Sequence, residues 1–147
     1  MASPVGPHPI VRIPADILNA IEAEANAARP AEACGLLIGR QVEDGYEITR
    51  HVPSRNLAAA PENRFEIDPL LQLHWQKTLR GTDAAVIGHY HSHPRGTPGP
   101  SATDIAEAHD PGLLWLITGL EPLTTRAFTL DARADQAHEL RLELQHS

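Results

Sequence analysis

The densest group of residues that could do chemistry lies between positions 88 and 104. Residues 88–94 read Gly-His-Tyr-His-Ser-His-Pro, and residues 101–104 read Ser-Ala-Thr-Asp after a loop of six residues. Residues two apart in an extended chain point to the same face, so His91 and His93 can present both imidazoles to one point. Two imidazoles and one carboxylate form a catalytic zinc set that leaves a position for water, and zinc lowers the pKa of that water to about 7. These residue types predict a metal site that includes Asp104.

Each part of this group also has an ordinary structural interpretation. Histidines in an H-x-H pattern at a strand end are often surface or hydrogen-bonded residues. Ser101 and Asp104 have the spacing of a helix capping box, in which both side chains satisfy backbone donors. His89 lies on the same strand face as His91 and is an alternative third ligand to Asp104. The joint spacing of the H-x-H-P motif, the Gly/Pro-rich loop and the S-x-x-D motif favours a metal site over these separate interpretations.

The elements that must position these residues follow from hydrophobic periodicity and from breakers. Helical spacing and capping residues predict three helices, over 16–29, 68–80 and 101–108. Short apolar or alternating runs predict strands over 10–13, 33–38, 41–42, 46–49, 64–67, 84–91, 113–118, 126–130 and 138–144. Residues 51–63 carry many breakers and predict a loop. The count predicts a mixed α/β fold with a central mixed sheet and about three helices, as a single domain over 10–147.

Composition argues against several classes of protein. The chain has 147 residues and a net charge of −7, and no segment approaches the roughly 20 apolar residues needed to cross a bilayer. The acidic balance, with no run of Lys or Arg, argues against nucleic acid or a membrane as partner. Residues 1–9 lack the features of a signal peptide and predict a short disordered lead-in. Cys34 is the single cysteine, which indicates a reducing cytoplasm, and its apolar surroundings predict an inert core thiol.

A larger pattern resembles a known family signature. A glutamate at the start of a strand, an H-S-H-P segment and an S-x-x-D motif are similar to the JAMM (MPN-plus) metalloprotease signature, here carried by Glu32, residues 91–94, Ser101 and Asp104. Further similarity to the compact prokaryotic members lies in residues 30–39, Asn56, Phe65 and residues 68–69. The resemblance covers about residues 10–130. It implies a cytidine-deaminase-like three-layer fold and a zinc-dependent peptidase.

The resemblance also implies a role for each motif residue. His91, His93 and Asp104 would bind Zn²⁺ with a water as the fourth ligand. Glu32 would take the proton of that water and later deliver it to the leaving amine, and Ser101 would hydrogen-bond the developing oxyanion. His89 is expected to lie below the metal in the strand without ligating it.

The small size of the chain bears on the expected substrate. The compact bacterial members are expected to act on ubiquitin-like sulfur carrier proteins that end in Gly-Gly, and this predicts cleavage of an amide bond after that diglycine. The extended tail of such a carrier can add as a strand to an exposed edge near the site. Two alternatives remain open from the sequence: a non-catalytic MPN scaffold module, and a zinc amidohydrolase with a small-molecule substrate.

The choice between His89 and Asp104 as the third ligand makes a testable prediction. We expect His89→Ala to keep stoichiometric zinc and Asp104→Ala to lose it, because a neutral alanine removes the proposed carboxylate ligand. Metal analysis of the purified variants checks this. Loss of zinc in His89→Ala with full retention in Asp104→Ala would reverse the assignment.

Overall fold

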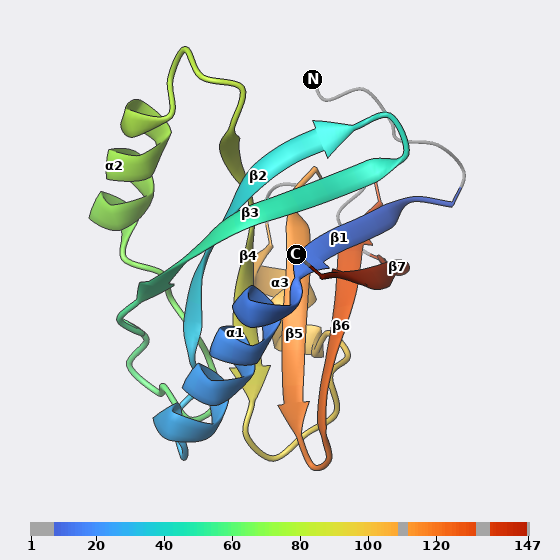
Figure 1. Ribbon diagram of the computed structural model, residues 1–147. Helices are drawn as coiled ribbons and strands as arrows, with labels where there is room; N and C mark the ends of the chain where they lie inside the picture. Colours follow the sequence, from blue (N-terminus) through green and yellow to red (C-terminus); the bar gives the residue numbers. More distant parts are fainter. Residues whose placement is uncertain (1–7, 109–111, 132–135, 147) are drawn as a thin grey trace.

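The computed structural model describes residues 8–108, 112–131 and 136–146. In this part the chain forms seven strands and three helices (Figure 1), which in chain order are β1 (Ile10–Pro14), α1 (Ala15–Ala28), β2 (Cys34–Val42), β3 (Gly45–Ser54), α2 (Pro69–Thr78), β4 (Ala85–His93), α3 (Ala102–Glu107), β5 (Leu114–Leu120), β6 (Leu123–Leu130) and β7 (Ala137–Gln145). The disordered lead-in expected over 1–9 falls mostly on residues 1–7, which lie outside the described residues.

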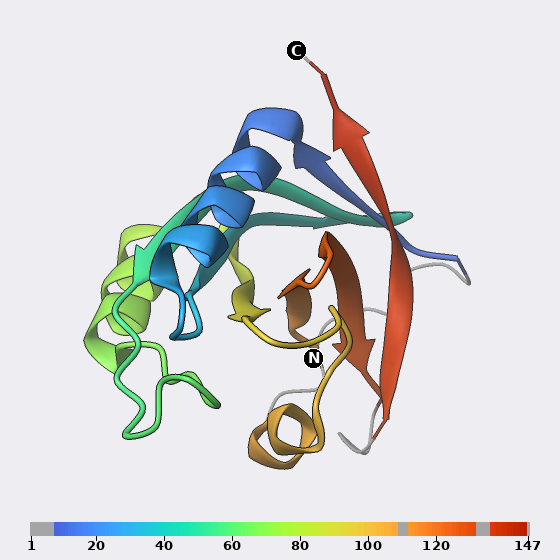
Figure 2. The same cartoon turned by 90° about the horizontal axis from the view of Figure 1, so that it is seen from below.

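The strands form one sheet that closes on itself in the order β1-β3-β2-β4-β5-β6-β7. β1 pairs parallel with β3 and β7, and β4 pairs parallel with β5, whereas the other neighbours are antiparallel. Figure 2 shows the strands curving around a centre, with α1 beside β1 and β3, and α3 beyond β4 and β5. The predicted mixed α/β fold with a central mixed sheet and three helices is confirmed.

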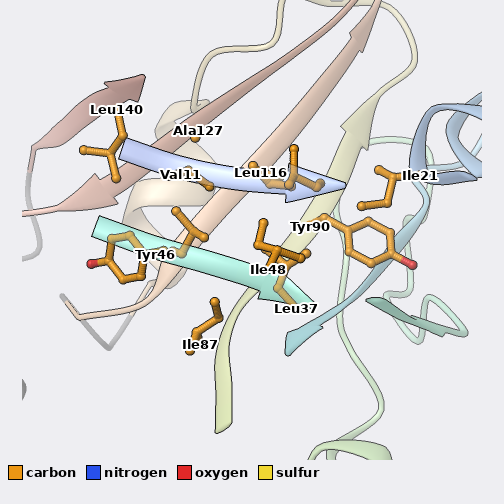
Figure 3. Close-up of a cluster of buried hydrophobic side chains, with 12 residues drawn as sticks. Val11, Ile21, Leu37, Tyr46, Ile48, Ile87, Tyr90, Leu116, Ala127 and Leu140 are labelled. Atoms are coloured by element: carbon orange, nitrogen blue, oxygen red, sulfur yellow. The ribbon is translucent and has the colours of Figure 1, made fainter. Parts of the chain in front are cut away.

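β5 is buried along its whole length because each of its faces is covered. Successive strand residues point to opposite faces. Leu116 lies in the main core with Ile21 of α1 (Figure 3), whereas Trp115 and Ile117 lie in a second cluster against Ile105 of α3. This two-sided burial explains the unbroken apolar run that predicted a central strand. It also places α1 and α3 on opposite faces of the strand beside the histidine motif.

Two predicted elements differ from the structure around residues 50–67. β3 continues to Ser54, into the predicted loop, because its pairing with β2 extends to the register Cys34–Ser54. The predicted strand over 64–67 is wrong: this segment contributes an isolated bridge between Asn56 and Ile67. Hydrogen bonds to the Asn56 side chain organise the segment, since Asn56 Oδ1 accepts from the amides of Ala58 and Glu66 at 3.0 Å each. The loop is therefore ordered by a side chain instead of a strand ladder.

The helix starts agree with the capping signals. Asp68 accepts a hydrogen bond from the Leu70 amide at 2.9 Å at the start of α2, and Ser101 caps α3. α2, which is described in full, has no buried residue, and Leu70 is 74% exposed. Among the described residues no helix has the length and apolarity to span a membrane.

The contrast between Leu37 and Leu70 tests the assignment of the core. Leu37 is fully buried in the main cluster, whereas Leu70 is 74% exposed. We expect Leu37→Ala to lower the free energy of unfolding by about 2–5 kcal/mol, because it leaves a cavity, and Leu70→Ala to change it by about 0.5 kcal/mol or less. Urea unfolding of both variants measures this, and equal losses would contradict the described core.

Candidate metal centre

The two motif histidines lie at the end of β4, whose backbone is held on both sides. His91 pairs with Cys34 of β2, and His93 pairs with Gly119 of β5. The ring centroids of the two histidines are 5.0 Å apart. Nε2 of each ring lies 3.0 Å from the same atom, Oδ2 of Asp104. The structure therefore brings together the three residues that the spacing predicted.

Asp104 reaches the histidines because it also closes the capping box of α3. The Ser101 amide donates to Asp104 Oδ2 at 2.9 Å, and the Asp104 amide donates to Ser101 Oγ at 3.0 Å. Burial opposes ionisation of this carboxyl, but hydrogen bonds from His91 and His93 outweigh it and hold the pKa of Asp104 well below its usual range. The same carboxylate oxygen of Asp104 therefore closes the helix cap and contacts both histidines.

Glu32 lies between α1 and β2 and is held by its backbone. Its amide donates to the Pro61 carbonyl at 2.7 Å, and its carbonyl accepts from Asn56 Nδ2 at 3.1 Å. The residue is 5% exposed, and its Oε1 atom is buried without a hydrogen-bond partner among the described residues. Burial raises the pKa of Glu32 from 4.5 to about 7, against the opposing effect of His93. A buried carboxylate oxygen without a hydrogen-bond partner is destabilising, which marks Glu32 as a functional candidate.

The donor atoms in this centre fit a divalent metal ion. Ligand atoms of Glu32, His91 and His93 lie within 4.8 Å of one another. The side chains of His91, His93 and Asp104 are 0%, 13% and 7% exposed, so they converge where water is scarce. Burial lowers the pKa of His91, which favours the neutral imidazole that binds metals. Nitrogen and carboxylate donors suit zinc, and similar sets hold iron or manganese.

The orientation of His93 is fixed by a backbone carbonyl. His93 Nδ1 lies 2.9 Å from the Thr97 carbonyl oxygen, which only accepts, so Nδ1 carries a proton. Nε2 donates to Asp104 Oδ2 in the metal-free protein, and loss of that proton would leave its lone pair for a metal ion. The loop that carries Thr97 packs directly on the backbone of Gly119 in β5. A Cβ at residue 119 would lie 2.6 Å from the Gly96 carbonyl oxygen and 2.8 Å from the Thr97 carbonyl carbon. The sequence analysis missed this support, because no short motif links Gly119 to Thr97.

His89 lies deeper along β4 among aromatic rings. Its ring centroid is 5.3 Å from that of Phe65 and 5.6 Å from that of Trp115, and it is 6.2 Å from that of His91. Burial lowers the pKa of His89 to about 3. Phe65 stacks on His91 with centroids 4.1 Å apart. The group of convergent ligand atoms formed by Glu32, His91 and His93 includes neither His89 nor Asp104, although Asp104 contacts both histidines. The expected role of His89 as a neighbour without a metal bond stays a prediction.

Ser101 and Cys34 lie where the sequence suggested. Ser101 is exposed at the start of α3 and its Oγ accepts from Asp104, which leaves its hydroxyl proton free to donate. Cys34 is 1% exposed, and burial raises the pKa of its thiol to about 12. A thiol with so high a pKa is a poor nucleophile, in agreement with an inert core residue.

Comparisons with known proteins show what the chain is similar to. A family model described as prokaryotic homologs of the JAB domain matches residues 14–131. A desampylase of Haloferax volcanii is 39% identical over 88 residues, which is 60% of this chain and 62% of the relative. A CysO-cysteine peptidase of Mycobacterium tuberculosis is 30% identical over 132 residues, or 90% of this chain and 80% of the relative. The solution structure of protein DSY2949 from Desulfitobacterium hafniense has a TM-score of 0.80 and 34% identity, with 94% of each chain covered.

Gly119→Ala tests the support of His93. A methyl group at this position must displace the loop that holds Thr97, so we expect zinc affinity to fall by roughly 10–100-fold in a folded protein. Competition with a chelator measures the affinity, and circular dichroism checks the fold. Gly99→Ala is the matched control, since its Cβ would meet nothing closer than Thr97 Oγ1 at 3.9 Å. Unchanged affinity in folded Gly119→Ala would refute this support.

Glu32→Gln tests the cost of the buried carboxylate in the metal-free protein. Because the pKa of Glu32 rises from 4.5 to about 7 on folding, the folded state binds more protons in this window, and its free energy of unfolding falls as the pH increases. Glutamine cannot ionise. We expect the metal-free variant to be more stable than wild type by roughly 1–3 kcal/mol at about pH 8, with little difference at about pH 4.

Chemical unfolding of both proteins at the two pH values checks this expectation. Glu62→Gln, a change at an exposed acid, serves as the control and is expected to show no such pH-dependent gain. A gain for Glu32→Gln that is the same at both pH values would contradict the account.

Proposed function

The chain belongs to the family of prokaryotic homologs of the JAB domain, and on this premise we propose that it is a zinc-dependent peptidase or isopeptidase. Its substrate is the amide bond after the C-terminal Gly-Gly of a ubiquitin-like sulfur carrier protein. The observation that carries the proposal is the convergence of Glu32, whose Oε1 is buried without a hydrogen-bond partner among the described residues, on two histidines that share one aspartate oxygen.

Three side chains would hold the metal in this proposal. They are His91 and His93 through Nε2 and Asp104 through its carboxylate, and the nitrogen–oxygen donor set supports zinc as its identity. When bound, zinc supplies a Lewis acid that polarises the substrate carbonyl and makes water acidic at neutral pH. The Thr97 carbonyl keeps His93 in the tautomer that this role requires.

Glu32 is the general base of the proposed reaction. It takes a proton from the attacking water and delivers it to the leaving nitrogen as the amide bond breaks. A pKa near 7 suits a group that must first accept and then donate a proton at neutral pH. The unpartnered Oε1 supports this role, because a carboxylate held by protein donors would have to break those bonds first.

Ser101 is the proposed donor to the oxyanion. Its hydroxyl proton is free because Oγ serves the cap of α3 as an acceptor. A hydroxyl aimed at the developing negative oxygen is worth a few kcal/mol of transition-state stabilisation. The same cap fixes the position of Asp104, so the metal ligand and the oxyanion donor are held by one turn of chain.

The names of the relatives and the burial of the site support a carrier tail as substrate. Two similar proteins are a desampylase and a CysO-cysteine peptidase. The His91 and Asp104 side chains are 0% and 7% exposed, and a residue without a side chain, such as glycine, can bring its carbonyl closest to them. The described strands close into one sheet, so a pairing tail would use the loop after β3 in place of a free strand edge.

We also propose a finer description of the fold and a compartment for the protein. Mixed strand pairing with covering helices supports the cytidine-deaminase-like three-layer arrangement as a description of the fold. The single cysteine supports a reducing cytoplasm as the place of action. The buried Oε1 of Glu32, which has no hydrogen-bond partner among the described residues, argues against a non-catalytic scaffold module. Such an atom destabilises the fold, and a scaffold module would gain neither metal binding nor catalysis from it.

Incubation of the zinc-loaded protein with a carrier whose Gly-Gly carries an added amino acid tests the function directly. We expect zinc-dependent release of that amino acid, detected by the mass of the carrier. Glu32→Gln is the control: it keeps its zinc and loses at least about 100-fold in turnover, the scale of a lost general base. No release from any Gly-Gly-tailed conjugate would overturn the proposal, and loss of zinc from Glu32→Gln would reassign Glu32 as a ligand.

A further inference from the structure

A cavity of about 770 Å³ lies beside the metal centre and has no role in the chemistry so far. Its walls come from the loop after β3, from α2, β4 and α3 and from the start of β5, and Figure 2 shows the loop and α3 below the end of β4. His91 and Asp104 form part of the wall. Anything that fills this cavity therefore lies next to the reacting bond.

The reaction geometry decides which part of a substrate enters the cavity. A tetrahedral carbon formed during amide hydrolysis carries the attacking oxygen, the oxyanion, the leaving nitrogen and the carbon chain on the acyl side. Glu32 serves the attacking oxygen and the leaving nitrogen, and Ser101 serves the oxyanion. Both residues are described, and neither lines the cavity. The remaining substituent, the acyl-side chain that belongs to the carrier tail, is the one that faces the cavity.

The walls of the cavity are mainly apolar. Phe65 and Trp115 contribute aromatic surface, and Ile67, Leu113 and three consecutive alanines from Ala58 contribute aliphatic surface. Two glycines have no side chains and cannot fill about 770 Å³. Such a space beside a Gly-Gly site is matched by the side chain of a preceding residue, whose transfer from water to apolar walls is favourable.

One ion pair lies in the cavity wall. Arg64 Nη1 lies 3.0 Å from Glu107 Oε1, which joins the loop after β3 to α3, and both residues line the cavity. Glu66 also lines the cavity but is exposed, so pairing with it would contribute little. A charged tail residue would otherwise have to compete with the Arg64–Glu107 pair or lose its hydration at the apolar walls, and both are unfavourable. An uncharged side chain meets neither obstacle.

We propose that this cavity is a specificity subsite for a bulky apolar side chain at the residue directly before the Gly-Gly of the carrier. The inference rests on the proposed function and adds the chemistry by which the enzyme selects its carrier. Two extended residues span about 7 Å, so a long side chain at this position reaches the cavity while the last glycine carbonyl lies at the metal residues.

A set of carriers that differ only in this residue tests the subsite. Each carries Leu, Phe, Gly, Asp or Lys before Gly-Gly and the same added amino acid. We expect kcat/KM for Leu and Phe to exceed that for Gly, Asp and Lys by about tenfold or more, the scale on which an apolar pocket discriminates. Equal values for all five would overturn the subsite and leave the peptidase function standing.

Two variants of the α3 region test whether the cavity determines the preference for the residue before Gly-Gly. Ala108 lines the cavity, whereas Ala106 is exposed on α3 and does not line it. We expect Ala108→Leu to reduce the preference for Phe over Gly at the tested position by about tenfold, because the larger side chain occupies the space. Ala106→Leu should keep the wild-type preference. Unaltered preference in folded Ala108→Leu would place the selection elsewhere.

A binding measurement separates failure of the subsite from failure of the proposed function. In Trp75→Phe protein, Trp115 is the one remaining tryptophan and reports on the cavity. A peptide that ends in Leu-Gly-Gly should change its fluorescence and bind at least about tenfold more tightly than a peptide that ends in Asp-Gly-Gly. This result supports the subsite even if no conjugate is cleaved. Equal binding of both peptides, or no change of Trp115 fluorescence, overturns it.

Discussion

One carboxylate oxygen is the constraint on which the site depends. Asp104 Oδ2 accepts from the Ser101 amide and lies 3.0 Å from Nε2 of both His91 and His93. Removal of a charge from water costs several kcal/mol unless donors surround it, and here a helix cap and two imidazoles do so. The same contacts fix where α3 begins relative to the end of β4. A shift of either element would break the cap and the pair of histidine contacts together.

The sheet supplies the rigidity that this arrangement needs. β4 is held between β2 and β5, and the Ser92 side chain and backbone both bond the Ala33 backbone, at 2.8 and 3.0 Å. That contact joins the histidine strand to the segment that carries Glu32. Asn56 adds a second link, because its Nδ2 donates to the carbonyls of Glu32 and Arg64 at 3.1 and 2.9 Å. The proposed base and the wall of the cavity are thus positioned by one side chain.

The sequence predicted what short-range patterns encode. The period of two placed His91 and His93 on one face, and the S-x-x-D spacing placed Asp104 in a cap; the structure has both features. Pairing across the sheet was harder to predict from the sequence, because the extension of β3 to Ser54 depends on a partner strand that no local pattern reveals. The segment over 64–67 resembled a strand because it alternates, yet Asn56 side-chain bonds replaced a ladder.

Supporting residues far apart in the chain were the least predictable. The packing of Gly119 under the Thr97 loop joins positions 22 residues apart that share no motif. Likewise, the stacking of Phe65 on His91 and the cavity behind it arise only when the loop after β3 meets β4. A local motif therefore predicts which groups are reactive, whereas their orientation and the shape of the substrate site depend on the closed sheet.

X-ray absorption spectroscopy at the zinc edge of the loaded protein tests the central claim most directly, because it counts the atoms bound to the metal. The account predicts a low-coordinate zinc with two imidazole nitrogens near 2.0–2.1 Å and oxygen ligands near 2.0–2.2 Å, the distances typical of such donors. In Asp104→Ala the first shell should change or the metal should be lost. A shell with three imidazoles, or one with sulfur at about 2.3 Å, would contradict the assignment of His91, His93 and Asp104.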